Sequence, residues 1–193
     1  AVSEAHLDVA QILIAHGADV NARATSGFTP LMFGVRHGDL DVSRMLLARG
    51  ADLNGAAADG TTALLIATVR GYPDLTALLL NAGADANASG TGYTALHWAA
   101  GSWETELTGE FGLDAPTSEW AALAGLTGEA KLELVSTLLA HGADPDVRTT
   151  RRVPRFGFSA GSSSPQFYGM LGATPFLLAA QAGPDLTRLR GDV

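Results

Sequence analysis

The triplet Gly-Ala-Asp occurs four times in this chain, at residues 17–19, 50–52, 83–85 and 142–144. The first three copies recur at a constant interval of 33, whereas the interval from position 83 to position 142 is 59. A fixed period of this size is typical of proteins that stack one supersecondary unit, because a single unit cannot bury its own apolar face. Such stacks act mostly through their exterior, by binding.

Each unit contains a threonine followed by small and apolar residues at helical spacing, which predicts a short first helix. The threonine hydroxyl can accept a hydrogen bond from a free backbone N–H at the helix start, and a following proline suits the first helical position. Gly38 and Gly71 are expected to end this helix. The expected N-cap residues are Thr29, Thr62, Thr94 and Thr174.

A second amphipathic helix is predicted to run from Asp41-Val42 to Leu46-Leu47 and to recur in the other units. The glycine of each Gly-Ala-Asp triplet then ends it in the left-handed conformation that favours glycine. The aspartate that follows occupies one position reused four times, so we assign it a role in a turn, because a catalytic residue is needed once. These aspartates are Asp19, Asp52, Asp85 and Asp144.

The stretch Thr94-Ala95-Leu96-His97-Trp98-Ala99-Ala100 lies nearest to the Thr-Pro-Leu-His pattern of ankyrin repeats. The chain resembles the ankyrin repeat family over nearly its whole length. The resemblance implies an all-α solenoid of helix–turn–helix units joined by hairpin loops, in one domain over residues 1–193. The expected parts are a partial repeat 1–24, repeats 25–57, 58–89 and 90–148, an extended loop at about 148–172 and a truncated repeat 172–193.

A first insertion interrupts the fourth unit. The interval from Thr94 to Gly142 is 48, against 21 from Thr62 to Gly83, so 27 extra residues lie at about 102–130. The stretch is acidic and contains Trp103 and Trp120. We interpret it as a loop that packs its tryptophans on the stack and exposes its acids to solvent. The alternatives are an acidic, aromatic lobe that binds a partner and a metal site, although the EF-hand spacing is missing.

A second insertion follows the fourth unit. The interval from Gly142 to Thr174 is 32, against 12 from Gly50 to Thr62, so this connection is longer by about 20. The segment combines arginines, including Arg151 and Arg152, with aromatic residues around a Gly-Ser stretch. An elongated hairpin with a solvated tip is our main interpretation. A protein contact and binding of single-stranded nucleic acid are the alternatives, and the surrounding negative charge disfavours the second.

The composition narrows the class of protein. Of the 193 residues, 47% are hydrophobic, which allows a sizeable core and excludes disorder throughout. The net charge of −8 disfavours a nucleic-acid partner. No cysteine is present, which excludes disulfides and fits any compartment, so no location is predicted. No apolar run reaches the length of a membrane span. The chain begins in mid-unit, and we expect it to be an excerpt of a longer one.

The residues that suggest chemistry have simpler interpretations. His97 stands at the histidine position of the ankyrin signature, where the resemblance implies a structural hydrogen bond between neighbouring turns. His16 and His141 each precede a helix-ending glycine, where a cation complements the helix dipole. No His-Glu-x-x-His helix occurs. We therefore predict a non-enzymatic protein without a metal or cofactor.

The resemblance implies that a protein partner binds on a concave face, made by the hairpin tips and the exposed side of the first helices. We expect a monomer or a component of a larger assembly. The alternatives are an enzyme or regulatory protein whose activity lies in the insertions or in missing flanks, and a structural spacer without a partner. The predicted partner-binding residues are Phe28, Arg36, His37, Arg70, Tyr93, Trp103, Trp120, Arg151 and Arg152.

Overall fold

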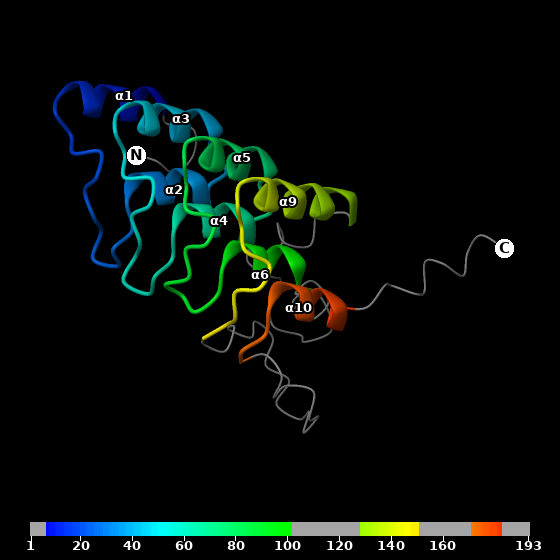
Figure 1. The fold of residues 1–193 in the computed structure, drawn as a ribbon. Helices are drawn as coiled ribbons and strands as arrows, with labels where there is room; N and C mark the ends of the chain where they lie inside the picture. The colour runs from blue at the N-terminus through cyan, green and yellow to red at the C-terminus, as the bar shows by residue number, and fades with distance from the viewer. Residues whose placement is uncertain (1–6, 102–127, 151–170, 183–193) are drawn as a thin grey trace, which may run out of the picture.

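The helices form two parallel rows with loops projecting on one side (Figure 1). The computed structural model describes residues 7–101, 128–150 and 171–182. The first row holds α2 (Pro30–Arg36), α4 (Ala63–Val69), α6 (Ala95–Ala100) and α10 (Pro175–Ala182). The second row holds α1 (Leu7–Ala15), α3 (Leu40–Ala48), α5 (Pro73–Asn81) and α9 (Gly128–Ala140). Each helix packs against the next in its row. The predicted all-α solenoid is confirmed.

Threonine caps begin the first-row helices as the sequence predicts. The hydroxyl of Thr29 accepts a hydrogen bond from the N–H of Met32 at 3.3 Å. The equivalent bonds run from Leu65 N–H to Thr62 (3.2 Å) and from Leu177 N–H to Thr174 (3.2 Å). Each bond satisfies a backbone donor that has no partner inside the helix. Thr94 caps α6 differently, through the ring of His97.

Glycine ends the second-row helices in the predicted left-handed conformation. The glycines of the four Gly-Ala-Asp triplets have φ angles between 82° and 96°. In each case the alanine that follows donates its N–H to a carbonyl five residues earlier, as in Ala51 to Leu46 at 3.0 Å. This bond satisfies one of the last helical carbonyls and turns the chain toward the next hairpin.

The core lies between the two rows. A leucine two residues after the cap is almost fully buried in three successive repeats, with 0%, 3% and 2% of Leu31, Leu64 and Leu96 exposed. Second-row leucines such as Leu79 and Leu138 are fully buried against them. The fifth repeat differs, because 72% of Phe176, the equivalent of Leu31, is exposed. Residues 183–193, where a second-row helix of that repeat would follow, lie outside the described residues.

The first insertion joins α6 to α9. Helix α9 has 13 residues, against nine for α3 and α5. It begins at Gly128, so residues 128–130, which we counted with the insertion, are helical. The ammonium group of Lys131 donates a hydrogen bond to the carbonyl of Gly101, just after α6. This bond links the two ends of the insertion and places a positive charge at the C-terminus of α6, where the helix dipole favours it.

Candidate functional site

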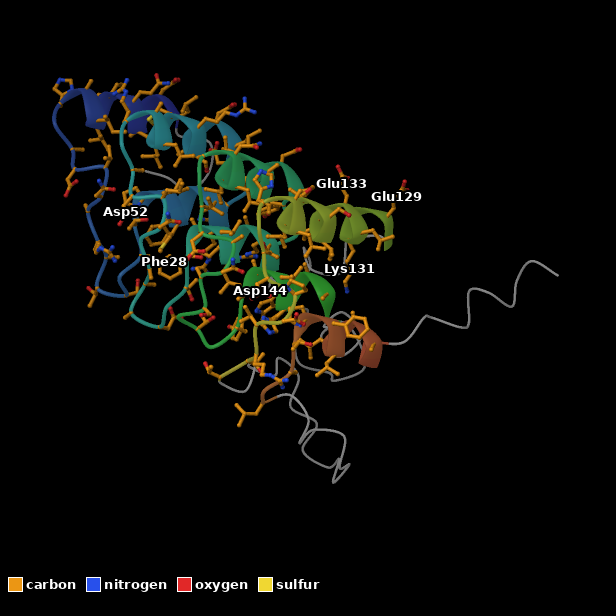
Figure 2. All side chains as sticks on the ribbon, in the orientation of Figure 1. Phe28, Asp52, Glu129, Lys131, Glu133 and Asp144 are labelled. Atoms are coloured by element: carbon orange, nitrogen blue, oxygen red, sulfur yellow. The ribbon has the colours of Figure 1, made fainter. Side chains whose placement is uncertain are left out.

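The hairpin tips and the first-row helices lie on the same side of the molecule (Figure 1). Figure 2 shows Phe28 on this side next to α2, whereas Glu129 and Glu133 point outward from α9 in the other row. This face, made of the tips and α2, α4 and α6, is called the hairpin face below. It corresponds to the face on which the family resemblance implies partner binding.

Successive hairpin tips touch through their backbones. The N–H of Ala58 donates to the carbonyl of Ser26 at 3.3 Å, and the N–H of Thr150 donates to that of Gly92 at 2.9 Å. Between these contacts, Gly60 (φ 89°) lies so close to the next tip that an added Cβ would be 2.6 Å from the nitrogen of Thr91. Only glycine fits a left-handed position pressed against another backbone. The tips therefore form one continuous edge.

The hairpin that contains the second insertion is closed by the same backbone hydrogen bond as two shorter hairpins. In three hairpins, the same N–H to carbonyl bond closes the base of the loop. The pairs are Ala24–Phe28 (2.9 Å), Ala57–Thr61 (2.8 Å) and Thr149–Ala173 (2.9 Å), which enclose residues 25–27, 58–60 and 150–172. The insertion thus lengthens the loop without opening its stem.

Two arginines support equivalent stems. Arg23 and Arg148 each stand six residues after a triplet glycine. The guanidinium of Arg23 donates to the carbonyl of Gly27 at 3.4 Å, and that of Arg148 donates to Gly172 at 3.1 Å. Arg23 also reaches the next repeat, through the carbonyl of Ala56 at 2.8 Å. The stem of the long hairpin therefore keeps the contacts of a short one.

His97 connects the fourth repeat to this stem. Its Nδ1 accepts a hydrogen bond from the N–H of Thr94 at 3.0 Å, and its Nε2 lies 3.2 Å from the carbonyl oxygen of Ala173. Because an N–H only donates and a carbonyl only accepts, the ring is neutral with its proton on Nε2. Burial lowers the pKa of His97 below 6.5, partly opposed by the carbonyls of Ala173 and Val147. The ring has no exposed surface.

A ladder of three asparagines links successive repeats next to the triplet glycines, where the second-row helices end. Each asparagine donates through Nδ2 to the triplet glycine of the next repeat and accepts through Oδ1 from the N–H of the triplet aspartate. The Nδ2···O distances for Asn21, Asn54 and Asn87 are 3.1, 3.4 and 2.8 Å, and the Oδ1···N distances are 2.6, 2.9 and 2.7 Å. Sequence analysis missed this role, although the recurrence of Asn four residues after the glycine was its signal.

The predicted partner-binding residues of the hairpin face differ in accessibility. Phe28 is half-buried, and its ring centroid lies 5.5 Å from that of Phe33. His37 and Arg70 occupy the C-cap positions of α2 and α4. His37 is exposed, whereas Arg70 and Arg36, the last residue of α2, are half-buried. Trp103, Trp120, Arg151 and Arg152 lie outside the described residues.

Tyr93 offers little surface to a partner. Only 9% of it is exposed, because its ring packs against Leu65 and edge-on against Trp98, with centroids 5.8 Å apart. Burial is the main cause that raises the pKa of the Tyr93 hydroxyl above 10.0. We therefore do not retain Tyr93 as an anchor, since a binding anchor must present its ring to solvent before the partner arrives.

Comparison with protein families identifies the repeat. A family model described as ankyrin repeats (many copies) matches residues 1–47, and one described as ankyrin repeats (3 copies) matches residues 54–107. Together the two matches cover more than half of the chain. The chain belongs to the ankyrin repeat family. A search of curated proteins found no significant match. Ankyrin repeats are generally protein–protein interaction modules and are typically not catalytic.

Within this ankyrin stack, three of the four triplet aspartates accept turn hydrogen bonds, as predicted. Asp19, Asp85 and Asp144 each accept a hydrogen bond from the N–H two residues further on, at 2.9, 2.9 and 2.8 Å. Asp52 instead lies 3.5 Å from the guanidinium of Arg23, a contact within the ion-pair range. All four carboxylates are exposed, and none is placed like a buried reactive group.

Two aromatic residues of the ankyrin hairpin face were not among the predicted site residues. Phe33 and Trp98 stand five residues after Phe28 and Tyr93, at equivalent positions two repeats apart, and each forms a ring pair with its partner. The recurrence of the pair at this spacing was visible in the sequence. That the two rings of each pair come into contact could be inferred only with the helix start at the intervening threonine, because this start brings both rings to one face.

Two further properties concern the described part of the ankyrin domain. Over residues 7–101, 128–150 and 171–182, no three His, Asp or Glu side chains gather in a way that could hold a metal ion. None of the helices in these ranges combines the length and apolar content needed to cross a bilayer.

Proposed function

We propose that this ankyrin domain binds a protein partner on its hairpin face, at the end formed by α2 and α4. The observation that carries the proposal is the aromatic pair of Phe28 and Phe33 beside basic residues. Phe33 and Arg36 are three residues apart on α2, so they share one face of the helix. Aromatic and arginine side chains contribute most of the binding energy in many protein interfaces.

The basic residues recur from one repeat to the next. His37 and Arg70 stand at equivalent positions of successive repeats, and each is the C-cap residue of its helix. Positive charge at a helix C-terminus stabilises the helix by a few tenths of a kcal/mol up to about 1 kcal/mol, so Arg70 also has a structural role. Binding and stability must therefore be measured on the same variants.

The test uses Phe28→Ala and the double variant Arg36→Ala/Arg70→Ala, immobilised as bait in cell extracts. Arg44→Ala is the matched control, because Arg44 is exposed on α3 in the other row. Partners captured by the unmodified chain are identified and quantified by mass spectrometry. Loss of a hot-spot residue costs about 2 kcal/mol or more, which corresponds to a drop in affinity of roughly thirtyfold.

The expected result is that both test variants lose the captured proteins, while Arg44→Ala retains them. Thermal unfolding of each variant shows whether the fold is intact. Unchanged capture by a folded Phe28→Ala and a folded double variant contradicts the proposal.

A further inference from the structure

The three asparagines of the ladder differ in the residue that follows them. Ala22 follows Asn21 and Ala88 follows Asn87, whereas Gly55 follows Asn54. Asn54-Gly55 is the one Asn-Gly pair in the sequence. A glycine after asparagine leaves the backbone nitrogen open to approach by the asparagine side chain, because glycine has no Cβ.

The packing explains why glycine stands at position 55. Gly55 is buried, and a Cβ added there would lie 2.7 Å from Oδ2 of Asp52 and 3.2 Å from Nη2 of Arg23. These two atoms belong to the contact between Arg23 and Asp52 across neighbouring repeats. A side chain at position 55 would displace them. The fold therefore places a glycine after a ladder asparagine at this one junction.

We propose that Asn54 is a site of spontaneous deamidation in the folded protein. The backbone nitrogen of Gly55 loses its proton and attacks Cγ of Asn54, so that a new C–N bond closes a five-membered succinimide ring. The bond from Cγ to Nδ2 breaks, and the side-chain nitrogen leaves as ammonia with the proton. One water molecule then opens the ring, which leaves aspartate or isoaspartate at position 54.

The surroundings of Asn54 support this step, and the bond to its leaving nitrogen distinguishes it from the other two asparagines. The N–H of Asp85 donates to Oδ1 of Asn54 at 2.9 Å, and it stabilises the negative charge that develops on this oxygen during attack. The leaving nitrogen, Nδ2, is held by the carbonyl of Gly83 at 3.4 Å, the longest of the three equivalent bonds. The side chain is also exposed to solvent, from which the water comes.

The product disturbs the ladder. A carboxylate at position 54 has no hydrogen to donate to the carbonyl of Gly83, and it brings a negative charge to the turn that contains Asp85. Isoaspartate also adds one atom to the backbone of this turn. Deamidation therefore weakens the junction between the second and third repeats and limits the lifetime of the stack.

The test incubates the full chain in mildly alkaline buffer and follows the gain of one mass unit at each asparagine by peptide mass spectrometry. Asn21 and Asn87 are internal controls within the same molecule. We expect Asn54 to convert faster than either by about tenfold or more, because Gly55 has no Cβ to hinder approach to its backbone nitrogen. Equal rates at the three asparagines, or an intact Asn54, overturn the proposal.

Two variants separate the roles of the glycine and of the fold. Ala88→Gly creates a second Asn-Gly pair at Asn87 and is expected to make that residue labile, though less than Asn54, because its Nδ2 is held at 2.8 Å. Asn54→Asp reproduces the charge of the product and is expected to unfold at lower urea concentration than the unmodified chain. An aged sample that is deamidated at Asn54 but keeps the original urea midpoint contradicts the proposed effect on the stack.

Discussion

The Nε2 atom of His97 lies 3.2 Å from the carbonyl oxygen of Ala173, which is 76 residues further along the chain. The same ring accepts a hydrogen bond from the N–H of Thr94 through its other nitrogen. One buried side chain therefore joins the start of α6 to the stem of the long hairpin. The fourth and fifth repeats stay in contact there, although the hairpin between them is much longer than its counterparts.

Replacing His97 by alanine is expected to destabilise the protein by about 3 kcal/mol. The change leaves a cavity and removes the partner of two buried backbone groups, and each effect costs 1 to several kcal/mol. Urea unfolding gives the free energy of unfolding. His16→Ala is the control, because His16 is exposed at the end of α1 and its loss should cost less than about 0.5 kcal/mol. Similar losses in both variants contradict the role assigned to His97.

Stability should also depend on pH through His97. Burial lowers the pKa of His97 in the folded state, so the unfolded chain binds a proton more readily than the folded chain. The stability that the neutral His97 ring contributes is therefore fully present above pH 6.5, the ordinary pKa of histidine. It is lost as the pH falls through the lower pKa that His97 has in the folded protein. Melting temperatures between neutral and mildly acidic pH should fall more for the unmodified chain than for His97→Ala. Parallel curves for the two proteins would refute this.

Alanine at position 60 should damage the edge formed by the hairpin tips. Gly60 and Gly50 have similar φ angles, 89° and 85°, but a Cβ at Gly50 meets nothing within 4 Å, whereas one at Gly60 meets the backbone of Gly90 and Thr91. Gly50→Ala should cost about 1–2 kcal/mol, the strain of a left-handed alanine. Gly60→Ala adds a clash with a neighbouring backbone, worth about 1–3 kcal/mol more. Equal urea midpoints for the two variants would show that the tips are not in contact.

Removing one step of the asparagine ladder should loosen the stack. Asn87→Ala breaks the bonds to Gly142 and Asp144, and we expect a loss of about 1–2 kcal/mol, as for two exposed hydrogen bonds. Hydrogen exchange should then quicken at the N–H of Asp144. Ser89→Ala, at an exposed position two residues further on, is the control. If Asn87→Ala leaves the free energy of unfolding unchanged, the asparagine bonds do not stabilise the stack. They would then form only because other contacts already align the repeats.

The sequence predicts the repeat and its local geometry well, because each unit contains its own signals. A cap such as Thr29 and a terminator such as Gly50 act within a few residues, so their roles can be inferred without knowledge of the neighbouring repeat. The interactions between repeats were harder to infer. The bond of Asn21 to Gly50 joins residues 29 positions apart and depends on how units stack. The bond of His97 to Ala173, 76 positions away, agrees with a contact that only the family resemblance implied.

The candidate site could likewise be predicted only in part from the sequence. Family resemblance implies which positions belong to the binding face, Phe28 among them, and Phe28 lies next to α2 (Figure 2). It does not indicate how far a ring is covered by its own neighbours. For example, the cover that Trp98 and Leu65 give to Tyr93 could not be predicted from its position in the repeat. The packing of neighbouring side chains determines how accessible a residue is. A single sequence indicates that packing only through the periodic spacing of its apolar residues.

Distances between labels on the second-row helices test most directly whether the chain is one continuous stack. Asp8, Asp41, Asp74 and Glu133 are exposed, and each stands nine residues before a triplet glycine. The chain contains no cysteine, so cysteines introduced in pairs at these positions can be spin-labelled selectively and measured by pulsed electron paramagnetic resonance. With neighbouring helices about 10 Å apart, the pairs 8/74 and 41/133 should give equal distances of roughly 20 Å, and 8/133 roughly 30 Å. A distance for 8/133 that is no longer than the other two, or unequal distances for 8/74 and 41/133, would contradict a stack that stays in register across the first insertion.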